Sequence, residues 1–246
     1  MSFSERFTDN SFDDPEMITP EMKTDNSFSN MSGQDLANHL EVKQYGPFVL
    51  TDAVRPALDL KIKPTQGYRH DVYVDEESGA TVPVIMASAS REILFGLFMD
   101  LVAKLGPVVD VVLETSHDST TGSHTDMYRE HIDAPVLTSN LWAYENLLTN
   151  DGCTGIAVLN PRTPQEVQFD EHKLLIIYGS PLEQFEYVLE SRGVPCKPQM
   201  QFITEAEHVH SSTEAFEFEF NQLRTDLGLD GASFEADADS DNGFQV

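Results

Sequence analysis

The chain has 246 residues, of which 42 are acidic and 15 are basic, and its formal net charge at pH 7 is −27. This charge argues against binding to nucleic acid or to an anionic membrane surface, because both depend on Lys and Arg side chains near phosphate groups. No apolar run approaches the roughly 20 residues that span a bilayer, so we expect no contact with membranes.

The beginning of the chain and its two cysteines indicate a cytoplasmic protein. The first thirty residues are acidic and lack the apolar segment of a secretory signal peptide. Cys153 and Cys196 are far apart and form no C-x-x-C pair, so neither a disulfide framework nor a cysteine zinc site is indicated. We expect both thiols to be reduced.

Composition divides the chain into three parts. Residues 1–37 are rich in acidic and small polar side chains, and their few apolar residues follow neither a helical nor a strand period. Residues 230–246 are acidic and contain no Lys or Arg. Such segments cannot bury enough apolar surface to offset the entropy of ordering. We predict a disordered N-terminal arm at 1–37, one domain at 38–229 and a disordered tail at 230–246.

The N-terminal arm contains a short repeat. The pentapeptide Thr-Asp-Asn-Ser-Phe occurs at residues 8–12 and again at residues 24–28. Two copies of an aromatic motif on a flexible arm would bind a partner protein with added avidity. The alternative interpretation is a duplicated segment of low complexity without a partner.

The first predicted elements of the domain are a hairpin, a helix and a strand. Strands at 71–75 and 81–87 flank a Gly-containing turn. A helix at 90–105 has apolar side chains around most of its circumference, so we expect burial on more than one side. Either the middle of the domain or a contact with a second copy of the chain would bury it. The strand at 108–113 is almost continuously apolar, which is typical of a strand covered on both faces.

The second half of the domain alternates between helices and strands. The predicted elements are a helix at 137–149, strands at 154–159, 166–169 and 173–178, a helix between Ser180 and Gly193, a strand at 200–203 and a helix at 211–227. Strands separated by helices usually form parallel neighbours. We therefore predict an α/β fold, α+β being possible, in which helices pack on a mixed, mostly parallel sheet. A ferredoxin-like arrangement and a small doubly wound sandwich both fit.

Potential metal ligands are densest in the polar segment after the strand at 108–113. The group consists of Glu114, His117, Asp118, His124 and His131. In open α/β sheets, ligands bind beyond the carboxyl ends of the strands, and imidazole together with carboxylate suits zinc, manganese or iron. The spacing matches no established motif, so a solvated loop with structural hydrogen bonds is the alternative.

A second group follows the predicted strand at 200–203 and consists of Glu207, His208 and His210. If that strand is parallel to the one at 108–113, both groups emerge at one edge of the sheet and form one site. His208 and His210 are equally consistent with an alternating pair on an extended segment.

The sequence leaves two functions open. The first is a non-enzymatic, acidic cytoplasmic module without catalytic residues or cofactor, which binds a protein partner or a second copy of itself through the helix at 90–105. The absence of a nucleotide-binding or serine-hydrolase motif favours it. The alternative is a hydrolase that depends on a divalent metal ion. In that case the His and carboxylate groups after residues 113 and 203 bind the ion, which activates water.

Overall fold

Seven strands form one sheet in the computed structural model, which describes residues 32–74, 79–117 and 124–229. The strands are β4 (Gly67–Val74), β5 (Thr81–Ser88), β6 (Val108–Thr115), β7 (Thr125–Asp133), β8 (Thr154–Leu159), β9 (Glu166–Phe169) and β10 (Leu175–Tyr178). Their order across the sheet is β4-β5-β10-β9-β8-β6-β7, and every neighbouring pair is antiparallel.

The predicted mostly parallel sheet, ferredoxin-like or doubly wound, is therefore wrong. Residues 160–165 alone separate β8 from β9, and residues 170–174 alone separate β9 from β10. Connections of this length form hairpins, because a parallel neighbour needs a crossover of about a dozen residues or more. The segment expected to be a polar loop forms β7, an edge strand that buries only Met127 and Ile132.

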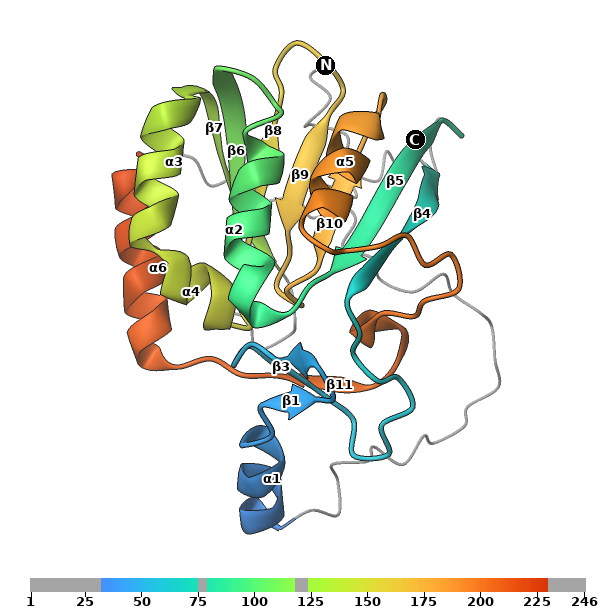
Figure 1. The fold of residues 1–246 in the computed structure, drawn as a ribbon. Coiled ribbons are helices and arrows are strands. Elements are labelled where there is room, and N and C mark those ends of the chain that lie inside the picture. Colours follow the sequence, from blue (N-terminus) through green and yellow to red (C-terminus); the bar gives the residue numbers. More distant parts are fainter. Residues whose placement is uncertain (1–31, 75–78, 118–123, 230–246) are drawn as a thin grey trace, which may run out of the picture.

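Helices cover one face of the sheet (Figure 1). They are α2 (Arg91–Val102), α3 (Ala134–Ala143), α4 (Glu145–Asn150), α5 (Glu183–Ser191) and α6 (Glu214–Asp226).

Helix α2 lies in the middle of this helical layer. Phe98 is fully buried, and its ring centroid is 5.2 Å from that of Phe169 on β9. The ring of Phe95 lies 5.0 Å from that of Trp142 on α3. The chain itself thus covers the apolar circumference predicted for the helix at 90–105. Contact of this helix with a second copy of the chain stays a prediction.

The opposite face of the sheet carries a second apolar cluster. Side chains of β5 and β10, among them Met86 and Tyr178, pack there against Met200 and Phe202. The segment with Met200 and Phe202 was predicted to be a strand, but it leads into a short 3-10 helix, Ile203–Glu205.

Smaller elements lie at one end of the sheet (Figure 1). They are α1 (Gly33–Leu40), the ribbon of β1 (Gln44–Tyr45) with β2 (Phe48–Val49), and the ribbon of β3 (Val54–Pro56) with β11 (His208–His210). A hydrogen bond from the Gly152 amide to the Ser211 carbonyl joins the β3–β11 ribbon to the residues just before β8. No helix in the described part of the chain is long and apolar enough to cross a membrane.

Several predictions concern residues outside the described ranges. Both copies of the repeated pentapeptide, at residues 8–12 and 24–28, lie there, as do Asp118 and the tail at 230–246. Helix α1 begins at Gly33, inside the arm predicted at 1–37. The division of the chain into arm, domain and tail stays a prediction.

Candidate metal centre

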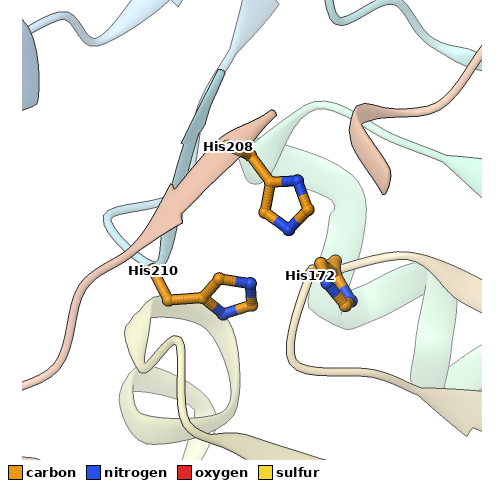
Figure 2. Close-up of side chains that lie close together, drawn as sticks. All are labelled: His172, His208 and His210. Atoms are coloured by element: carbon orange, nitrogen blue, oxygen red, sulfur yellow. The ribbon is translucent and has the colours of Figure 1, made fainter. Parts of the chain in front are cut away.

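Three histidines meet where the β3–β11 ribbon faces the end of the large sheet. His208 and His210 are two positions apart on β11, so their side chains project from the same side of the strand. His172 lies on the hairpin between β9 and β10. The three imidazole rings point toward one another (Figure 2). Each of the three residues is partly buried.

The rings are close enough to share one ion. The ring centroid of His172 is 4.9 Å from that of His208 and 4.7 Å from that of His210, and the last two are 5.1 Å apart. One potential ligand nitrogen of each histidine lies within 4.8 Å of those of the other two. In a tetrahedral zinc site, with Zn–N bonds of about 2.1 Å, ligand nitrogens are about 3.4 Å apart. Each ring therefore needs to move by less than about 1 Å to bind zinc.

Hydrogen bonds orient the two imidazoles of β11. His208 Nδ1 lies 2.8 Å from the carbonyl oxygen of Ala206, and His210 Nδ1 lies 2.6 Å from the carbonyl oxygen of Gly152. A carbonyl oxygen only accepts hydrogen bonds, so Nδ1 carries the proton in both rings and Nε2 keeps its lone pair. This is the tautomer that binds a metal ion through Nε2.

A carboxylate orients the third imidazole. Asp170 Oδ2 lies 3.0 Å from His172 Nδ1, while Asp170 Oδ1 accepts a 2.7 Å hydrogen bond from the amide of Leu174. The second bond fixes the carboxylate to the backbone of its own hairpin. A histidine whose Nδ1 faces a carboxylate has the arrangement common among metal ligands, because the carboxylate sets the tautomer and increases the basicity of the ring.

The electrostatic surroundings of the three histidines differ. Burial lowers the pKa of His208 and of His210, and the neighbouring His172 lowers both further. Burial also acts to lower the pKa of His172, but the charge and hydrogen bond of Asp170, together with the charge of Glu171, raise it overall. The two β11 imidazoles therefore stay neutral at pH 7, as metal binding requires.

A small cavity of about 40 Å³ adjoins one of the three histidines, His172. Its lining includes His172, Lys173 and Leu174 of the hairpin, and Phe202 and Ile203 of the segment before β11. This volume has room for a water molecule beside His172.

Two of the three candidates in the second predicted group thus belong to the three-histidine cluster. His208 and His210 belong to the cluster, whereas Glu207 precedes β11 and is not among the three residues whose ligand atoms converge. His172 was not predicted. The signal that points to it is the short connection between the strands at 166–169 and 173–178, which places a histidine at a hairpin tip.

The described members of the first predicted group are dispersed along β6 and β7. His124 Nε2, just before β7, lies 3.6 Å from Glu171 Oε1, while the His131 side chain is 65% exposed near the other end of β7. Seven residues of extended strand separate the two histidines by about 23 Å. Glu114 accepts hydrogen bonds of 3.1 and 3.2 Å from the Gln168 amide.

His117 takes part in a second cluster. Its ligand nitrogen, a carboxylate oxygen of Asp151 and the Sγ of Cys153 lie within 4.8 Å of one another. Neither Asp151 nor Cys153 was among the predicted ligands, because they precede β8, far from His117 in the sequence.

The loops after residues 113 and 203 reach the same end of the sheet, and the potential ligands that converge among their described residues belong to two neighbouring clusters. The Ser116 amide donates a 3.0 Å hydrogen bond to the Cys153 carbonyl, while His210 contacts the adjacent Gly152 carbonyl. The backbone of Gly152 and Cys153 therefore connects the two ligand clusters.

Comparisons with protein-family models, with curated proteins and with solved structures gave no match for this chain.

Proposed function

We propose that the chain is a metal-dependent hydrolase whose zinc ion is bound by His172, His208 and His210. The observation that supports this function is the convergence of three imidazoles whose Nδ1 atoms each face an oxygen atom of the protein. Three histidine ligands leave a fourth position for water, and this is the ligand set of a catalytic zinc site rather than a closed structural one.

In this proposal the three histidines would hold an ion that activates water. Zinc would lower the pKa of that water to about 7 and so favour attack on a carbonyl or phosphoryl centre at neutral pH. Glu171 is the carboxylate to which we assign the proton of this water. Its charge acts on all three histidines. One of its oxygens accepts a 3.2 Å hydrogen bond from Ser116 Oγ, which holds the side chain in place.

The charge of the chain restricts the substrate class. A net charge of −27 repels polyanions at long range, so we assign the site a neutral or cationic substrate. Both Cys153 and Cys196 are free thiols, which supports a reducing compartment and hence the cytoplasmic location that we propose.

The non-enzymatic protein-binding module stays a prediction. The apolar helix at 90–105 is the main argument for such a module. However, side chains of that helix pack against Phe169 and Trp142 of the same chain. The three-histidine cluster is a specific observation in favour of the hydrolase, so we place the hydrolase first.

Zinc binding is tested on the full chain. The purified protein is stripped with a chelator, titrated with zinc and analysed for bound metal, alongside His210→Gln. The exposed His131 serves as a matched control in the variant His131→Asn, because Asn tolerates the positive φ of 55° at that position. We expect His210→Gln to lose one zinc ion per chain and His131→Asn to lose none. Equal zinc binding by all three proteins would refute the centre.

Hydrolysis is tested on the same proteins. Zinc-loaded wild type and His131→Asn should cleave an activated carboxylic ester or an uncharged phosphate triester at equal rates, and His210→Gln should be at least about 100-fold slower. If the loaded wild-type protein cleaves neither type of ester faster than His210→Gln, the metal centre remains and the hydrolase is rejected.

A further inference from the structure

The cluster of His117, Asp151 and Cys153 lies beside the three-histidine centre, connected to it through Gly152. His117 follows β6, and the other two residues belong to the connection between α4 and β8. One nitrogen, one oxygen and one sulfur atom of these side chains lie within 4.8 Å of one another. The Asp151 side chain is fully buried and that of His117 is 7% exposed.

Two polar atoms of this cluster are buried without a hydrogen-bond partner, His117 Nε2 and Asp151 Oδ1. The remaining atoms are paired: Asp151 Oδ2 accepts a 2.5 Å hydrogen bond from Thr154 Oγ1, and His117 Nδ1 lies 2.7 Å from Thr115 Oγ1. His117 Nε2 is 3.0 Å from Asp151 Oδ2, yet it makes no hydrogen bond there. Since buried polar atoms are almost always paired in native proteins, both unpaired atoms point to a missing partner.

The chemistry of the cluster favours a cation as the missing partner. The Asp151 side chain is fully buried, and buried carboxylates are paired with a cation or bind a metal ion. The nearby buried cation, Lys173, donates a 2.7 Å hydrogen bond to the Thr154 carbonyl rather than to Asp151.

We propose that His117, Asp151 and Cys153 bind a second zinc ion. Sulfur, nitrogen and oxygen ligands together suit zinc, whereas calcium and magnesium take oxygen ligands. The ion would bind His117 Nε2, Asp151 Oδ1 and the Cys153 thiolate, which provides both unpaired atoms with a partner. This proposal rests on a different set of residues from the proposed function and does not depend on it.

Cys153 would bind the ion as a thiolate, which is the form of cysteine that binds metal ions. When zinc binds, the S–H bond breaks, sulfur donates its electron pair to zinc, and the proton leaves to solvent.

The second ion would join segments that lie far apart in the sequence. The ring of His117 contacts that of Phe220 on α6, with centroids 5.4 Å apart. The ion would therefore connect the residues after β6 and before β8 to the helical layer. An ion that binds only the folded chain stabilises it, so removing the ion should lower the melting temperature.

Cobalt substitution tests this proposal, because a cobalt–thiolate bond produces an intense near-ultraviolet absorption band and a cobalt–imidazole bond does not. The full chain is stripped, loaded with Co²⁺ and compared with Cys153→Ser. The matched control is Cys196→Ser, which removes the exposed cysteine instead. A third variant, His210→Gln, removes a ligand of the three-histidine centre alone.

We expect the thiolate band in the wild type, in Cys196→Ser and in His210→Gln, and its loss in Cys153→Ser. Zinc per chain should fall from two ions to one in Cys153→Ser and in His210→Gln. A wild-type protein without the band, or a band that Cys196→Ser abolishes, would overturn the second site. Because the wild type and Cys196→Ser decide the result, the test does not require Cys153→Ser to fold. The band persists if the three-histidine centre alone proves wrong, so the two proposals fail separately.

Discussion

At the scale of single residues, the candidate centre depends on which nitrogen of each imidazole carries the proton. Three different oxygen atoms determine this, namely two backbone carbonyls and the Asp170 carboxylate. The two carbonyls belong to the backbone and are retained in any side-chain variant. Asp170 is therefore the position at which substitution can test the orientation of a ligand without removing the ligand itself.

Replacing Asp170 with Asn should weaken zinc binding by about 10–100-fold, because the carboxylate behind His172 increases the basicity of that ring. Asn keeps an oxygen that can accept the hydrogen bond from the Leu174 amide. Zinc affinity is measured by competition with a chromophoric chelator, and Asp59→Asn, at an exposed carboxylate, is the control. Equal affinity in Asp170→Asn and wild type would contradict this assignment.

Glu114 shows how burial changes the charge of a carboxyl group. Burial and the nearby Asp126 raise its pKa to about 8, so the folded chain keeps it protonated at neutral pH. The unfolded chain ionises it at about 4.3. Between pH values of about 4.3 and 8, Glu114 is protonated in the folded chain and ionised in the unfolded chain. The contribution of the Glu114 carboxyl to stability is therefore complete below its pKa in the unfolded chain, and it is lost as the pH rises through its pKa in the folded chain.

Glu114→Gln should accordingly be more stable than the wild type in alkaline solution. We expect its melting temperature to exceed that of the wild type by about 3 °C or more at about pH 9, and the difference to shrink toward about pH 5. Glu130→Gln, at an exposed position of β7, should show no such trend. A difference that is the same at both pH values would mean that Glu114 is ionised in the folded chain.

At the scale of elements, the two ligand clusters depend on the close approach of the β3–β11 ribbon to the residues before β8. Gly152 is the point of contact. A Cβ atom there would lie 2.5 Å from the Ala53 carbonyl oxygen and 2.9 Å from backbone atoms of Ser211. Both neighbours are backbone, so neither can rotate away. The absence of a side chain at Gly152 allows His210 to reach its position.

Gly152→Ala should destabilise the fold by about 1–3 kcal/mol, since overpacking forces the backbone apart, and it should weaken zinc binding because it displaces β11. Gly96→Ala is the matched control: its Cβ would meet nothing within 4 Å, and it lies within α2. The control should be neutral or stabilising by up to about 1 kcal/mol. Thermal melting and the zinc titration measure both effects. Unchanged values for Gly152→Ala would show that the ribbon can shift freely.

At the scale of the whole molecule, the net charge of −27 acts against the compact state. Screening should relieve this repulsion, because the Debye length falls from about 10 Å at 0.1 M salt to about 3 Å at 1 M. We expect the melting temperature to rise by several degrees as NaCl increases over this range. Sodium chloride is preferred to sulfate, which would also strengthen apolar burial. A constant or falling melting temperature would show that repulsion does not limit stability.

Local sequence patterns were sufficient to predict where several elements lie and that the helix at 90–105 has to be buried, because periodicity and apolar content are local properties. Strands at 154–159 and 166–169 match the bounds of β8 and β9. The sequence patterns did not predict the polar strand β7, because an edge strand with two buried side chains lacks the apolar run that identifies a strand.

The direction of the strands and the composition of the ligand clusters depend on packing between distant parts of the chain, so local patterns did not predict them. His172 and His210 lie 38 positions apart and meet because a hairpin and a ribbon approach the same end of an antiparallel sheet. His124 and His131 are close in sequence, yet an extended strand separates them. Sequence spacing predicts proximity only within one helix or strand. Contacts between elements depend on how the apolar faces pack, and this is a property of the whole chain.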